Sequence, residues 1–210
     1  MEENINLENL LDLPENRFPS DYAGQKLFIR GEDSDNNAML NWTSFPLDLY
    51  AGGYKDAADT LARVLLDRKA PMDSAIYPLV FLYRQGIELQ LKLILPLARR
   101  LNGEKTKKDL SHGLKAMWKE LRDILATIDP REEDLELPAM ENFIMELHEI
   151  DPESFAFRYP TDRKGNATLP DLTHINIRHL AEIMDSVFLM FMGIHSYLGE
   201  MERTDGSCFA

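Results

Sequence analysis

The 210-residue sequence contains one cysteine, no long hydrophobic run and none of the common catalytic sequence motifs. Cys208 stands alone near the end of the sequence, which excludes an internal disulfide and a cysteine-based zinc site. The most apolar late run, residues 187–194, is far shorter than the roughly 20 residues that span a bilayer. The sequence opens on acidic residues and lacks the apolar core of a signal peptide. We therefore expect a cytoplasmic protein that does not bind a membrane.

The motifs of nucleotide hydrolysis and metal catalysis are also missing. Neither of the phosphate-binding glycine loops, G-x-G-x-x-G and G-x-x-x-x-G-K-S/T, occurs, and neither does the H-E-x-x-H zinc helix or the G-x-S-x-G turn. His174 and His179 are five residues apart, a poor match to paired ligands on one helical face. The sequence therefore predicts no metal and no other cofactor.

Basic residues are outnumbered, and their distribution is uneven. The net charge of −13 opposes non-specific attraction to phosphate backbones. Residues 84–122, however, contain ten Lys or Arg against four Asp or Glu, whereas residues 131–153 contain one Arg against nine acids. This asymmetry indicates either two solvated faces of opposite charge or a local basic surface for a nucleotide or RNA.

The composition, with 44% hydrophobic and 28% charged residues, is that of a globular protein with one substantial core. Residues 1–45 are rich in Asn, Asp and Glu, and we predict an extended N-terminal arm. Residues 46–203 are predicted to form a helical bundle domain. A small β-hairpin or ordered loop is expected near 154–170, where aromatic residues alternate around a Gly-Asn turn. A flexible tail, 204–210, follows.

Apolar periodicity predicts five helices, near 46–69, 73–102, 112–127, 138–150 and from 171–173 to 201. The first begins at Pro46, because proline is tolerated in a first helical turn. The second is apolar on two opposite sides, which indicates a central helix. We therefore expect an all-α fold, an up-and-down bundle of four to five helices.

Two polar tracks interrupt these apolar helices. Arg84, Glu88 and Lys92 (the Arg84 track) are spaced by four, as are His174, Arg178 and Glu182 (the His174 track). This spacing places each set on one helical face. If the second and last helices pack together, the tracks could line one polar pocket. The alternative is that Arg84–Glu88 and Glu88–Lys92 are only intrahelical pairs, worth about 0.2–0.5 kcal/mol each.

Arg158 and His112 are further candidate site residues. In the segment FRYPTD, an arginine between aromatic residues suits stacking and bidentate recognition of a phosphate or carboxylate. Alternatively, Arg158 pins the expected hairpin through Asp162 or a helix C-terminus. His112 begins the predicted third helix, where a histidine serves as a cap or, because imidazole titrates near neutrality, as an acid–base group.

Residues 77–198 resemble the HEPN-type helical bundles of bacterial defence and toxin–antitoxin loci. The resemblance is carried by LYRQGIELQLKLIL, LSHGLKAMWKEL, FRYPTDRKG and a long final helix. It implies a helical bundle, commonly a homodimer, with metal-independent RNase activity or a nucleotide- or RNA-binding role. Catalytic members carry an arginine followed four to six residues later by a histidine, and no arginine here has one. The resemblance therefore favours the fold more than the nuclease activity.

Together these observations predict a HEPN-like protein that binds a nucleotide, RNA or protein partner in defence or stress, without a clear catalytic motif. Arg84, Lys92 and Arg158 are expected to contact phosphate, with Glu88 orienting the arginines. His112 and Glu88 are the candidates if the protein is catalytic. The ligand-binding candidates are Arg84, Glu88, Lys92, Arg158, Asp162, His174 and Arg178. Two alternatives are a metal-independent endoribonuclease and a structural dimerisation or antitoxin-like module.

Overall fold

The structure, a computed structural model, describes residues 19–104, 113–129 and 136–207. Its contacts divide the chain into two units, Met1–Ser44 and Phe45–Ala210. In the first unit the described residues contain two short 3-10 helices, η1 (Pro19–Tyr22) and η2 (Ser34–Asn36). The side chain of Asn37 closes the turn at η2, because it accepts the N–H of Gly31 at 2.8 Å and donates to the carbonyl of Gly31 at 3.0 Å.

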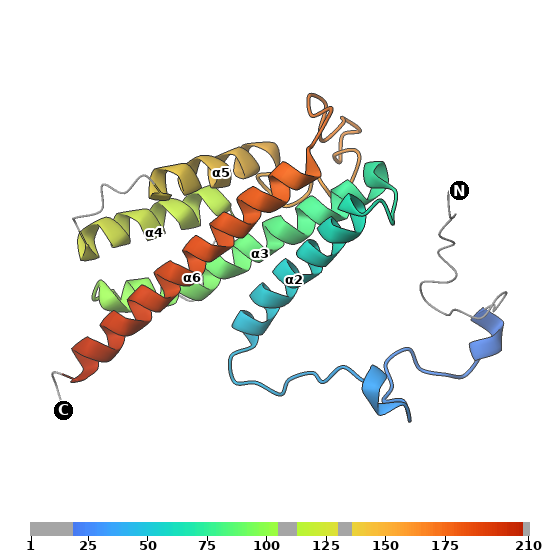
Figure 1. Cartoon of the computed structure of the whole chain (residues 1–210), viewed down its shortest axis with the longest axis horizontal. Coiled ribbons are helices and arrows are strands. Elements are labelled where there is room, and N and C mark those ends of the chain that lie inside the picture. Colours follow the sequence, from blue (N-terminus) through green and yellow to red (C-terminus); the bar gives the residue numbers. More distant parts are fainter. Residues whose placement is uncertain (1–18, 105–112, 130–135, 208–210) are drawn as a thin grey trace. The chain divides into compact units, whose positions relative to one another are not determined.

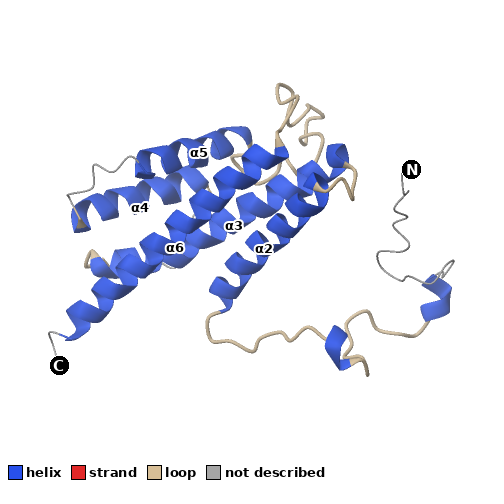
Figure 2. Ribbon diagram, viewed as in Figure 1, coloured by secondary structure: helices blue, strands red, loops and turns tan. Residues whose placement is uncertain are grey.

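The second unit is a helical bundle (Figure 1). Its described helices are α2 (Pro46–Leu66), α3 (Met72–Leu101), α4 (Leu114–Ile128), α5 (Glu136–Ile150) and α6 (Ile177–Ser207). No strand occurs in the described part of the chain (Figure 2). The prediction of an all-α fold is therefore confirmed for the residues that the structure describes.

Helix α3 lies at the centre of the bundle, as its two apolar sides predicted. It packs against α2, α4 and α6, and Figure 1 shows α2 on one side of it with α4 and α5 on the other. Packing is tight at Gly86, where an added Cβ would lie 2.7 Å from the Phe188 ring of α6. A glycine fits this position because the buried Phe188 ring occupies the space that a side chain would need.

The ends of three helices differ from the expected ones. Helix α2 begins at Pro46 as predicted but ends at Leu66, a few residues early. Helix α6 begins later than predicted because the Asn176 side chain caps it, accepting the N–H of His179 at 3.0 Å. Helix α6 also continues through Ser207, beyond its predicted end. The predicted start of the third helix, at residue 112, lies outside the described residues, and the described helix starts at Leu114.

The segment between α5 and α6 is an ordered loop. The β-hairpin predicted near 154–170 is not confirmed, because the segment forms only one antiparallel bridge, Thr161 to Ala167. Asp162 closes the turn between Thr161 and Ala167, because its Oδ1 accepts the N–H groups of Lys164 at 2.8 Å and Asn166 at 2.9 Å. Gly165, with a φ of 86°, supplies the left-handed conformation in this turn.

Candidate functional site

The predicted site residues fall into two separate groups. Arg84, Glu88 and Lys92 are on α3 inside the bundle, whereas the other described candidates lie in the loop before α6 or in its first turn. The latter candidates are Arg158, Asp162, His174 and Arg178. His112, the candidate for proton transfer, lies outside the described residues.

The inner group is a network of charged side chains on α3. Arg84 is fully buried, and its Nη1 donates to Glu88 Oε2 at 3.1 Å. Lys92 Nζ donates to Glu88 Oε1 at 2.7 Å. Both intrahelical pairs expected from the spacing are therefore present, and Glu88 connects the two cations.

Arg84 also binds the beginning of the loop that follows α5. Its Nε donates to the backbone carbonyl of Asp151 at 3.0 Å and lies 3.5 Å from the Asp151 carboxylate, while Nη2 donates to the carbonyl of Pro152 at 3.4 Å. Asp151 is only 1% exposed. We call Arg84, Glu88, Lys92 and Asp151 the Arg84 cluster. A phosphate could reach Arg84 only if this loop moved, so the phosphate contact predicted for Arg84 is not supported by its surroundings.

Asp151 was not identified from the sequence, although it has a clear structural role. Its Oδ1 accepts the N–H groups of Phe155 at 2.6 Å and Ala156 at 2.9 Å, which fixes the first turn of the loop. An Asp-Pro pair directly after a helix is a turn signal, and that signal was available at residues 151–152. The Arg84 cluster thus holds the loop against the central helix.

His148, in the last turn of α5, is near enough to Arg84 to be affected by its charge. Burial lowers the pKa of His148, and the nearby positive charges of Lys115 and Arg84 lower it further, although Glu149 opposes them. Its Nδ1 is buried and has no hydrogen-bond partner among the described residues. The imidazole is therefore held in its neutral form more strongly than an exposed histidine.

The hollows that His174, Arg178 and Glu182 line in the described part of the chain contain no residue of the Arg84 track. Arg84 contacts Glu88 and the first residues of the loop after α5, and not the His174 track. The reason is that α6 starts at Ile177, so His174 lies in the preceding loop rather than on the same helical face as Arg178. Arg178 and Glu182 line a shallow recess with α2 instead.

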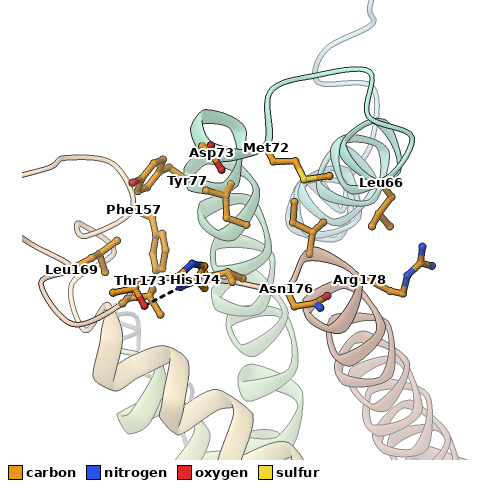
Figure 3. A pocket seen from close by; sticks show the side chains of 14 residues that line it. Leu66, Met72, Asp73, Tyr77, Phe157, Leu169, Thr173, His174, Asn176 and Arg178 are labelled. Atoms are coloured by element: carbon orange, nitrogen blue, oxygen red, sulfur yellow. Dashed lines mark hydrogen bonds between the residues drawn. The ribbon is translucent and has the colours of Figure 1, made fainter. Parts of the chain in front are cut away.

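A larger hollow lies at the end of the bundle, where α2 ends and α3 and α6 begin (Figure 3). We call it the His174 hollow, and its volume is about 580 Å³. Figure 3 shows Phe157 and Leu169 at one side of it and Arg178 at the other. His174 Nδ1 lies 3.1 Å from Thr173 Oγ1. The remaining polar lining residues are Asp73, Tyr77 and Asn176.

A second hollow adjoins the first. This Arg158 hollow has a volume of about 450 Å³ and is lined by Tyr77 and by parts of the loop, 156–160 and 167–169. Tyr77, Phe157 and Leu169 line both hollows. Three of the predicted residues, Arg158, His174 and Arg178, thus line two neighbouring hollows, although they come from different segments.

Arg158 is held in place without an acidic partner. Its Nε donates to the carbonyl of Ser154 at 2.6 Å, and its guanidinium lies 5.6 Å from the ring centres of both Phe81 and Tyr159. Its expected partner Asp162 is occupied elsewhere. Hydrogen bonds, first that of the Asn166 side chain, lower the pKa of the Asp162 carboxyl. No ion pair joins Arg158 to Asp162 in the described part of the chain.

Comparison with known proteins gives no relative: no protein-family model, no curated protein and no solved structure matches this chain. Among the described residues, no group of three or more His, Cys, Asp or Glu side chains could hold a metal ion. None of the described helices is long and apolar enough to cross a membrane. The site is therefore defined by its own geometry, which combines cations and aromatic rings around two hollows.

Proposed function

We propose that this chain is a HEPN-like cytoplasmic protein of a defence or stress system that binds a nucleotide or an RNA end in the His174 hollow. The supporting observation is that Arg178, which has no hydrogen bond or ion pair among the described residues, lines this hollow together with His174 and Tyr77. A volume of about 580 Å³ lies within the range of small-ligand pockets. The helical bundle agrees with the HEPN resemblance, which also implies a homodimer.

The polar groups of the hollow suit the parts of a nucleotide. An arginine donates two parallel hydrogen bonds to a phosphate, which makes Arg178 the anchoring group. Tyr77 is 48% exposed and offers an aromatic face to a base. Asp73 can accept hydrogen bonds from a ribose hydroxyl or a base amino group. A local anion site is needed because the net charge of −13 gives no general attraction.

The test is a titration of AMP against the wild-type protein and Arg178→Ala at low ionic strength. Loss of a charge-assisted hydrogen bond should weaken binding about 10- to 100-fold. Arg163→Ala is the matched control, since Arg163 is an exposed arginine of the loop before α6 and lines neither hollow. Equal affinities of wild type and Arg178→Ala would refute the proposed site, and so would the absence of AMP binding.

A metal-independent endoribonuclease is the second candidate, because His174 and Arg178 line one hollow although the usual motif is absent. RNA incubated with the protein and EDTA should then be cleaved, and His174→Ala should abolish the cleavage. Cleavage lost in His112→Ala instead would assign the role to His112.

The third candidate, a structural dimerisation or antitoxin-like module, is favoured by the internal pairing of the Arg84 cluster. It predicts a dimer with no affinity for AMP or RNA, as measured by light scattering and titration.

A further inference from the structure

The Arg158 hollow suggests that the ligand is longer than one nucleotide. We propose that the two hollows bind consecutive nucleotides of a single-stranded nucleic acid, with Arg158 contacting the second one. This inference rests on the proposed function of the His174 hollow and names the class of its ligand. The basis is that Tyr77, Phe157 and Leu169 form a wall common to both hollows.

The guanidinium of Arg158 is positioned as an anion-binding group. Its single hydrogen bond, from Nε to Ser154, leaves both terminal nitrogens without a partner in the described part of the chain. Contacts with the rings of Phe81 and Tyr159 restrict the guanidinium, so little conformational entropy is lost when an anion binds. In a chain of net charge −13, two arginines without carboxylate partners, Arg158 and Arg178, line adjoining hollows.

Aromatic rings accompany each of these arginines. Tyr159 is 49% exposed and stacks on Phe155, with ring centres 4.6 Å apart. This stack holds the Tyr159 ring in one orientation while half of the residue stays open to solvent. Tyr77, also half-exposed, serves both hollows. All four bases can stack on such rings, and the guanidinium plane of an arginine adds to this stacking.

This geometry favours a single-stranded ligand over a duplex. Each hollow has an aromatic ring at its wall, and a base can reach such a ring only when it is unstacked from its neighbours. Bases within a duplex are stacked and paired, so a duplex could present only its phosphates to Arg158 and Arg178. We therefore expect the pair of hollows to discriminate against double strands.

The experiment compares AMP with the RNA dinucleotide pApA, which adds one base and one phosphodiester to it. Stacking of the second base should make pApA bind about 10- to 100-fold more tightly than AMP. Arg158→Ala and Tyr159→Ala should remove this gain and leave the affinity for AMP unchanged. Arg178→Ala should weaken both ligands, and Arg163→Ala should weaken neither.

The outcomes separate this inference from the proposed function. If AMP binds through Arg178 but pApA binds no more tightly, the second subsite is refuted and the proposed function stands. If Arg158→Ala weakens AMP as much as pApA, Arg158 belongs to the first subsite and the inference is also refuted. If neither ligand binds, the proposed function and this inference are both refuted. If a duplex RNA of about ten base pairs binds as tightly as one of its separated strands, the inference of single-strand binding is refuted.

Discussion

The Arg84 cluster and the two hollows place the same kind of side chain in opposite environments. Arg84 is 0% exposed and donates to Glu88 and to two backbone carbonyls. Arg158 and Arg178 line open hollows and have no carboxylate partner among the described residues. A buried arginine requires its partners, whereas an exposed arginine can exchange water for a ligand. The difference assigns a structural role to the buried arginine of α3 and leaves the arginines of the loop and α6 available for the proposed ligand.

The two regions are connected through one segment of the loop. Asp151 contacts Arg84 and also fixes the N–H groups of Phe155 and Ala156. The next residues, Phe157 and Arg158, line the hollows. The Arg84 cluster therefore fixes the start of the segment that carries two residues of the proposed binding site.

The largest expected effect is the loss of the cluster in Arg84→Ala. The change leaves Glu88 paired with Lys92 but removes the cation beside the buried Asp151 carboxylate. Removing one partner of a buried charge pair typically costs about 3–5 kcal/mol. Urea unfolding monitored by circular dichroism should measure this loss. The control Arg163→Ala should leave the free energy of unfolding nearly unchanged. A loss below about 1 kcal/mol would show that the cluster is not a major source of stability.

A smaller effect is expected at Gly86, two residues from Arg84 on α3. Gly86→Ala would force apart α3 and the Phe188 ring, and overpacking of this kind typically costs about 1–3 kcal/mol. The matched control is Gly193→Ala in α6, where an added Cβ meets nothing within 4 Å. That change should stabilise the protein by about 0.5–1 kcal/mol, because alanine favours a helix. Thermal unfolding should therefore show a lower melting temperature for Gly86→Ala and a higher one for Gly193→Ala than for the wild type.

The pH dependence of stability should report on the cluster through His148. Its pKa is lowered in the folded state by burial and by Lys115 and Arg84. The unfolded chain therefore binds the proton more readily, so stability falls as the pH drops through the unfolded value of about 6.5. Urea unfolding between pH 7.5 and 5.5 measures this loss. His148→Gln should reduce it, and an unchanged pH profile would contradict the assignment.

The smallest effect on stability is expected in the hollows. Arg178→Ala and Arg158→Ala should change the free energy of unfolding by less than about 0.5 kcal/mol, because neither arginine has a buried charge partner. The two variants should nevertheless alter ligand affinity. Destabilisation as large as that of Arg84→Ala would remove the distinction between the two regions.

The helices and the local pairs of the Arg84 track were predictable from the sequence because both depend on residues three or four positions apart. The contact of Arg84 with Asp151 was not predictable, because 67 positions separate the two residues and the sequence contains many acids. The start of α6 was missed for a different reason, because the deciding contact is local. Apolar periodicity predicted the helix, but the Asn176 cap decided that His174 lies before it.

The four formal charges of the Arg84 cluster cancel, since Arg84 and Lys92 contribute two positive charges and Glu88 and Asp151 contribute two negative ones. A mutation at one position leaves an uncompensated charge in the core, whereas a paired neutral replacement such as Arg84→Met with Asp151→Asn restores the balance. In a set of homologous sequences, positions 84 and 151 should therefore vary together. The covariation would link the central helix to the loop that carries Phe157 and Arg158 of the proposed site.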